Sequence, residues 1–166
     1  MSDFEDALQQ RLSSNTEMAE RRKAAEDAMD RQLAEAPARD AALEGARRAR
    51  HAELAAHLQD VADRLKASAP DSFIVRTGWT ESGEEFIAKL STRQMAPKRS
   101  LFIEVDRDDD EVLARWTSGL GSAIEIWRLL EVVPQMLTDL VLQVAADEAW
   151  AGDRPPPFPA GVDPQG

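Results

Sequence analysis

The spacing of apolar residues changes along the chain, and its clearest pattern lies near the C-terminal end. Residues 134–150 read as one amphipathic helix, with Pro134 suited to the first helical position and Gly152 suited to a cap after the last turn. Four large apolar residues recur at the 3.6-residue period and share one face: Leu137, Leu140, Val141 and Val144. This face predicts a core helix that packs against a second apolar surface.

Between residues 71 and 133 the period changes to two, which is typical of strands. Apolar and polar residues alternate in five segments: 73–79, 86–90, 101–105, 112–116 and 123–127. The last segment can also be read as the opening of a helix that continues to Val133, although its β-branched residues favour a strand. The connections are too short for parallel crossovers, so we expect an antiparallel meander.

The alternation also predicts what each face of the sheet carries. The apolar face is expected to carry Val75, Ala88, Ile103, Ala114 and Ile126. The opposite, wetted face is expected to carry Arg76, Lys89, Glu104, Arg115 and Glu125. A helix over residues 134–150 is about 25 Å long, which matches a strand of seven residues and would cover the apolar face.

The N-terminal third of the chain predicts helices with little to bury. Ser2 with Glu5, and Ser14 with Glu17, both form the S-x-x-E pattern of a capping box, so two helix starts are expected. Large apolar residues are sparse, and the heptad signal is poor between residues 15 and 50. Pro37 disfavours helical geometry at the residue before it and predicts a break or kink.

From residue 54 the apolar spacing becomes regular. A stripe at spacings of four, three and four is typical of a helix packed on a partner: Leu54, Leu58, Val61 and Leu65. A continuous helix over residues 15–66 would measure about 78 Å, against about 30 Å for a compact domain of some 80 residues. We therefore expect most of this helix to project, to fold back at Pro37, or to pair with another chain.

These patterns together predict an α+β protein with three regions. The first is an extended, coiled-coil-like helical region over residues 1–68 that breaks near Pro37. The second is an antiparallel sheet of four or five strands with its C-terminal helix, over residues 69–150. The third is a disordered, proline-rich tail over residues 151–166, since this stretch has no apolar period.

Composition narrows the classes of function. The 166 residues carry a net charge of −11, which opposes binding to nucleic acid or to an anionic membrane. No cysteine is present, so disulfide scaffolds and thiolate chemistry are excluded. The start of the chain lacks the pattern of a signal peptide, and no apolar run approaches the roughly 20 residues of a membrane helix. We expect a cytoplasmic protein.

Two patterns resemble metal sites. Asp106, Asp108 and Asp110 copy the first three ligand positions of a calcium loop, but Glu111 stands where the loop needs glycine and Thr117 where it needs glutamate. An acidic hairpin turn explains them better.

The two histidines, His51 and His57, are six residues apart and do not share one helix face as metal ligands would. We expect both to be exposed helix residues with carboxylate neighbours, and we expect no metal and no cofactor.

Two further patterns could hold a phosphate. Gly119 and Gly121 form a lone G-x-G without the third glycine of a dinucleotide site, so a turn is expected. Arg93, Lys98 and Arg99 form a basic cluster in a loop, for which a solvated loop is the simpler interpretation. No serine or threonine lies in a nucleophile-elbow sequence.

The residues that we expect at an interface are apolar side chains that the predicted core does not use. Trp127 and Trp150 would lie away from the core faces of their elements, and Leu142 projects opposite the core stripe of its helix. A second contact there would come from the helix that ends at Leu65 or from another protomer. The complete set of possible interface residues is Leu54, Leu58, Val61, Leu65, Trp127, Leu142 and Trp150.

The sequence contains no catalytic motif, and its architecture favours a non-catalytic protein–protein interaction protein of adaptor, chaperone-like or structural type. We expect it to self-associate through its helices, most simply as a homodimer. The outline is loosely similar to secretion chaperones and adaptors, by architecture and not by any motif. The alternative is a ligand-binding domain or enzyme with a pocket between sheet and C-terminal helix, lined by Arg76, Arg115 or Trp127.

Overall fold

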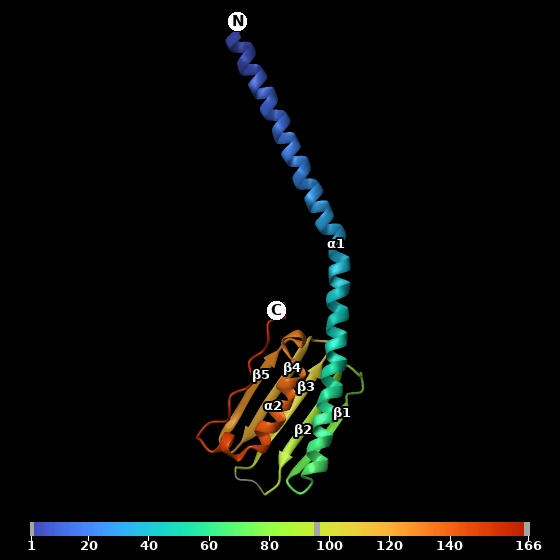
Figure 1. Ribbon diagram of the computed structural model, residues 1–166, viewed down its shortest axis with the longest axis vertical. Coiled ribbons are helices and arrows are strands. Elements are labelled where there is room, and N and C mark those ends of the chain that lie inside the picture. Colours follow the sequence, from blue (N-terminus) through green and yellow to red (C-terminus); the bar gives the residue numbers. More distant parts are fainter. Residues whose placement is uncertain (1, 95–96, 165–166) are drawn as a thin grey trace. The chain divides into compact units, whose positions relative to one another are not determined.

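The computed structural model describes residues 2–94 and 97–164 and shows one long helix, a five-stranded sheet and a shorter second helix (Figure 1). Two short 3-10 turns, Leu129–Glu131 and Asp147–Trp150, flank the second helix. The main elements in order are α1 (Ser2–Ser68), β1 (Phe73–Trp79), β2 (Glu85–Thr92), β3 (Arg99–Asp106), β4 (Glu111–Ser118), β5 (Gly121–Trp127) and α2 (Pro134–Ala145). The predicted α+β class is confirmed.

The chain divides into two compact units, Met1–Glu44 and Gly45–Gly166, which we call the helical unit and the sheet unit. The boundary therefore falls inside α1 and not near residue 68, where the sequence pattern placed it. The physical reason is that Leu54 and Leu58 are fully buried in the core of the sheet unit, so the last turns of α1 belong to that core.

The strands form an antiparallel meander in the order β1-β2-β3-β4-β5, as the short connections predicted. Residues 121–127 form the fifth strand and not the start of a helix. Gly83 lies in the turn between β1 and β2 with a φ of 73°, a left-handed conformation that glycine adopts without strain. This turn helps to fix the register of β1 against β2.

One strand presents the opposite face from the one predicted. Ser118 pairs with Gly121 across a two-residue turn, so Ala114 pairs with Glu125 and shares its face. Ile126 was expected on the covered face, but it lies on the opposite face and is 52% exposed. The prediction failed because a shift of one residue in register inverts every side chain of a strand.

The C-terminal part of α1 and the whole of α2 cover one face of the sheet (Figure 1). His57 of α1 lies 2.7 Å from the Thr138 hydroxyl of α2, so the two helices contact each other directly. The four predicted core residues of α2 are at most 2% exposed, and Trp116 of β4 belongs to the same buried core. This packing confirms the predicted sheet-on-helix layer.

Pro37 does not interrupt α1, and no second helix start occurs at Ser14. A proline lacks the N–H that would bind the carbonyl four residues earlier, which costs a helix about 3 kcal/mol. The alanine-rich neighbourhood favours helix, and Arg39 donates to the carbonyl of Gln32 one turn before the proline. The Ser2 side chain, part of the first predicted capping box, lies outside the described residues.

The C-terminal end differs from the prediction in two respects. Helix α2 ends at Ala145 and not at Trp150, because Ala146 adopts an extended conformation before the 3-10 turn. The proline-rich tail is not disordered: the Phe158 ring stacks on Trp116 with centroids 5.3 Å apart, and the Val162 N–H donates to the Glu131 carbonyl. The tail packs because an aromatic ring and a backbone hydrogen bond fix it to the sheet unit.

Candidate functional site

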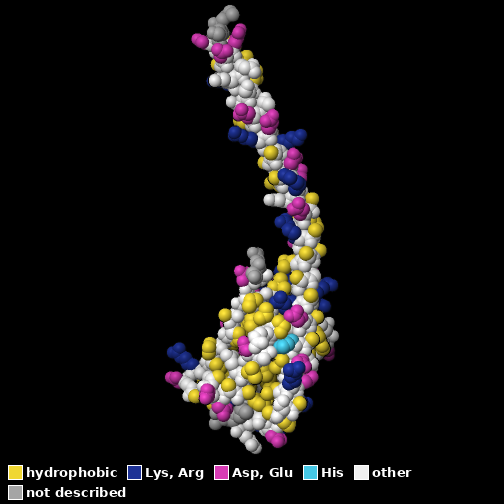
Figure 2. Space-filling view, viewed as in Figure 1, with side chains coloured by type: hydrophobic (Ala, Val, Ile, Leu, Met, Phe, Trp, Pro, Cys, Tyr) yellow, Lys and Arg dark blue, Asp and Glu magenta, His cyan; other side chains and the backbone are white. Residues whose placement is uncertain are grey.

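Seven of the thirteen exposed large apolar residues in the described part of the chain belong to the helical unit. At about 100° per residue, these seven residues fall within an arc of about 140° on one side of the helix. Their exposed fractions run from 42% to 73%. We call this set the helix stripe: Phe4, Leu8, Leu12, Met18, Met29, Leu33 and Leu43. Figure 2 shows apolar side chains between charges of both signs along this helix.

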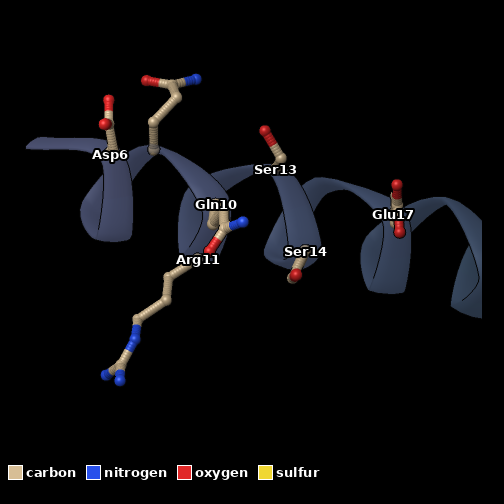
Figure 3. Close-up of a pocket in the computed structure, with 7 residues that line it drawn as sticks. Asp6, Gln10, Arg11, Ser13, Ser14 and Glu17 are labelled. Carbon is tan, nitrogen blue, oxygen red and sulfur yellow. The ribbon is translucent and has the colours of Figure 1, made fainter. Parts of the chain in front are cut away.

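A hollow of about 760 Å³ follows the first turns of the helical unit. It is lined by Asp6, Arg11, Ser13 and Glu17, among others. Figure 3 shows that the Arg11 side chain points away from Asp6 and Ser13, so the lining groups do not converge on one point. This geometry describes the surface of a single helix and not a binding pocket.

A second groove, of about 450 Å³, lies between α1 and the first hairpin of the sheet unit. Trp79 is 53% exposed, and its ring contacts the rings of His51 and Phe86. Arg48 and Arg107 also line the groove, and Arg107 pairs with Glu84 at 3.3 Å. The sequence interpretation missed this groove, because only the fold brings His51 beside a tryptophan at the end of β1.

The histidines are not the exposed helix residues that the sequence predicted. His51 is buried, and its Nε2 lies 2.8 Å from the Glu84 carbonyl oxygen in the hairpin. His57 binds the Thr138 hydroxyl as described above. Both side chains connect α1 to the rest of the sheet unit, and their hydrogen bonds are those of structural residues.

The acidic segment after β3 forms a hairpin turn. Asp106 is buried, and its Oδ1 accepts the N–H groups of Asp108 and Asp109. Asp110 pairs with Arg47 and Arg128 and accepts the N–H of Leu129. Carboxylates of this kind suit a hard cation. Their hydrogen bonds, however, already explain why aspartates stand at these positions.

Carboxyl oxygens of Glu85, Glu104 and Asp106 lie within 4.8 Å of one another at this end of the sheet. Burial, followed by the negative charges of Asp106 and Glu85, raises the pKa of the Glu104 carboxyl above its ordinary value. Burial likewise raises the pKa of Asp106, although its two backbone N–H donors oppose the shift. The hydroxyl groups of Thr80 and Ser82 lower the pKa of Glu85.

The raised pKa of Glu104 predicts a pH-dependent cost to stability. The folded chain binds the proton of the Glu104 carboxyl more tightly than the unfolded chain does. Ionisation of Glu104 therefore lowers the free energy of unfolding above the raised pKa, and protonation removes this loss as the pH falls through that pKa. Glu104→Gln is therefore expected to raise the free energy of unfolding at pH 7. The gain should vanish toward about pH 4, near the ordinary carboxyl pKa.

Urea unfolding of dilute protein between pH 4 and pH 8 measures this difference. Glu81→Gln, at an exposed turn position, is the control and should change stability little at any pH. A Glu104→Gln gain that is absent at pH 7, or that does not depend on pH, would contradict the assignment.

The basic cluster of the sequence divides in the structure. Arg99 is not a solvated loop residue: its side chain is buried, and it donates to the carbonyls of Val144 and Pro97 and to Asp147. Its guanidinium also lies over the Trp150 ring. Arg93 and Lys98 are exposed. Arg99 thus fixes the end of α2 to the sheet.

Most of the residues predicted at an interface already have partners in their own chain. Leu54 and Leu58 are fully buried, and Val61 and Leu65 pack against the same core. Trp127 and Trp150 are also buried. Leu142 alone of the set is strongly exposed, at 58%, and it lines a groove of about 420 Å³ beside the tail. The helix that ends near Leu65 is the C-terminal part of α1. It makes its contacts with the sheet and with α2.

The uncovered face of the sheet carries charges and apolar side chains together. Arg76, Lys89 and Arg115 lie on this face, with Lys89 and Arg115 over the Phe102 ring. Arg76 and Arg115, two of the three residues that the alternative hypothesis named for its pocket, therefore lie on the face of the sheet away from α2. Ile124 and Ile126 add exposed apolar area at its β5 edge.

No protein family model, curated protein or solved structure matches this chain. Among the helices of residues 2–94 and 97–164, none combines the length and apolar character that crossing a bilayer requires.

Proposed function

We propose that this protein is a non-catalytic protein–protein interaction protein that self-associates through the helix of its helical unit. The helix stripe carries the proposal, because seven large apolar side chains share one face and remain exposed within that unit. A helix of this length with no covered face is stabilised when its apolar stripe packs against another helix. The sheet unit is a folded body, and the apolar residues of α1 that belong to this unit already pack in its core.

The charge and composition of the chain support this proposal. The net charge of −11 favours solubility and disfavours nucleic acid as a partner. The lack of cysteine fits the reducing cytoplasm. We therefore propose that the protein forms a homodimer and that it is located in the cytoplasm. We do not propose the pocket enzyme, because side chains of the core occupy the contact between the sheet and α2.

Charged residues in the helix stripe are expected to weaken self-association. The double variant Leu8→Glu, Met29→Glu places four carboxylates in the contact of a dimer and removes four apolar side chains. Full burial of such a side chain contributes about 1.5–3 kcal/mol, so we expect Kd to rise at least about 100-fold. Analytical ultracentrifugation of the full chain measures the change.

The matched control is Gln10→Glu, Ala24→Glu, which adds the same charge on the opposite side of the helix and should leave Kd unchanged. Equal effects of the two double variants, or dimers that tolerate the stripe variant, would show that the helix stripe is not the contact.

A further inference from the structure

The helix stripe follows a heptad frame whose polar residues fall at regular places. Alternate spacings of four and three place every seam residue on the same side of the helix. The d positions are Phe4, Arg11, Met18, Ala25, Gln32 and Arg39. The a positions are Leu8, Asn15, Arg22, Met29, Ala36 and Leu43. Seven of these twelve residues are apolar, and the others are three arginines and two amides. The polar residues at these positions weaken the heptad signal in the sequence.

We propose that residues 4–43 pair with the same residues of a second copy as an antiparallel two-stranded coiled coil, centred between Lys23 and Ala24. The inference rests on the proposed self-association and assigns its direction and register. The observations that carry it are the exposed helix, its seam and the positions of the charges on that seam.

The seam residues complement one another in this register. An a residue of one helix faces a d residue of an antiparallel partner, so Leu43 meets Phe4 of the second copy and Met29 meets its Met18. Asn15 meets Gln32, and two amides can exchange hydrogen bonds across the seam. Apolar residues therefore meet apolar ones at both ends and near the centre, and the buried amides meet each other.

The three seam arginines decide the direction of pairing. In a parallel pair, Arg11, Arg22 and Arg39 would each meet their own copy, and like charges at a seam are strongly unfavourable. In the antiparallel register they meet residues without charge, which are Ala36, Ala25 and Leu8 respectively. Small or apolar neighbours accommodate the aliphatic stems of the arginines while their guanidinium groups reach the edge of the seam.

Acidic residues of the second copy lie where those guanidinium groups emerge. The antiparallel register places Arg11 within about one turn of Asp40, Arg22 within one turn of Glu26, and Arg39 within one turn of Glu5. Each arginine thus has an acidic neighbour and no arginine directly opposite, although Arg22 of the two copies, and Arg11 and Arg39, come within one turn of each other. The loss of these direct arginine–arginine contacts distinguishes the antiparallel pair from the parallel pair.

Pro37 is compatible with this arrangement. It follows Ala36, an a residue, and so occupies a b position on the side of the helix away from the seam. The proline ring is therefore not required to enter the contact with the second copy.

The 166-residue chain has no cysteine, so single introduced thiols report the pairing without background. Met18→Cys and Met29→Cys are prepared separately, then oxidised either alone or after mixing. A disulfide requires the two Cα atoms to lie within about 7 Å. In the proposed register Met18 lies opposite Met29 of the second copy, whereas two copies of Met18 are eleven residues apart along the seam, about 16 Å.

We expect the mixture to yield about tenfold more covalent dimer than either variant alone, because only residues 18 and 29 meet within disulfide reach. Ala38→Cys, on the outer side of the helix, is the control and should yield little dimer alone or in any mixture. Light scattering of the unmodified chain accompanies the cross-linking.

More covalent dimer from Met18→Cys alone than from the mixture would overturn the inference and show parallel pairing, while self-association stands. Dimers in light scattering without cross-links above the control would also overturn it and place the contact elsewhere, for example on the uncovered sheet face. Single chains in light scattering would overturn the proposed function itself.

Discussion

Trp116→Ala is expected to lower the free energy of unfolding of the sheet unit by about 3–5 kcal/mol, the usual cost of truncating a large buried aromatic residue. Trp116 is 0% exposed, stacks on Phe158 of the tail and contacts Trp150 edge to face, with centroids 5.4 Å apart. Its removal leaves a cavity between the sheet and the tail and takes away both ring contacts. Urea unfolding followed by far-ultraviolet circular dichroism measures the loss.

The matched control is Trp79→Ala, because Trp79 also makes two ring contacts on the same face of the sheet but is half exposed. Its cost should be about 1 kcal/mol. The tail should also become protease-sensitive in Trp116→Ala, since Phe158 loses its stacking partner. Equal costs for the two tryptophan variants would contradict the full burial of Trp116.

Arg99→Met is expected to cost about 3 kcal/mol in the free energy of unfolding, although methionine retains most of the apolar stem. The substitution leaves the carbonyls of Val144 and Pro97 without their charged donor, and hydrogen bonds to charged groups contribute about 1.5–3 kcal/mol each. The contribution from Asp147 is small, because that carboxylate is 70% exposed and is screened by solvent.

Lys98→Met tests the same chemical change one residue earlier, at an exposed position, and should alter stability by less than about 0.5 kcal/mol. Hydrogen exchange at the C-terminal end of α2 should increase in Arg99→Met and not in Lys98→Met. If the Arg99 side chain were instead exposed and mobile, Arg99→Met and Lys98→Met would be equally stable.

The layers of the sheet unit could be predicted because they depend on local periods. The period of two over residues 73–116 requires strands, and the leucine and valine face of α2 requires an apolar partner within reach. Both patterns arise from burial of one face, and both were confirmed. The class of the fold therefore follows from residues within one element at a time.

The errors arose where a residue's partner lies far along the chain. Arg99 reads as part of a polar loop, and its acceptors Val144 and Asp147 are 45 and 48 residues away. The face of β5 depends on a two-residue turn, because apolar Ile124 and Ile126 alternate with apolar neighbours as well as with Glu125. The buried tail likewise depends on Phe158 reaching Trp116, which no local pattern indicates.

The helix stripe could be predicted only in part. Phe4, Leu8 and Leu12 stand out at a spacing of four, but arginines and amides at seam positions obscure the repeat after Leu12. Those polar residues reduce the hydrophobic signal while they restrict the possible pairings to one direction. The residues that hide the contact in the sequence are therefore the ones that define it in the inferred dimer.

The molar mass of the unmodified full chain in solution tests self-association most directly. Light scattering over a series of concentrations should show a species of twice 18.4 kDa, the mass of one chain, which dissociates on dilution. The Leu8→Glu, Met29→Glu variant should remain near 18.4 kDa over the same range. A value of 18.4 kDa for the unmodified chain at every concentration would contradict the account.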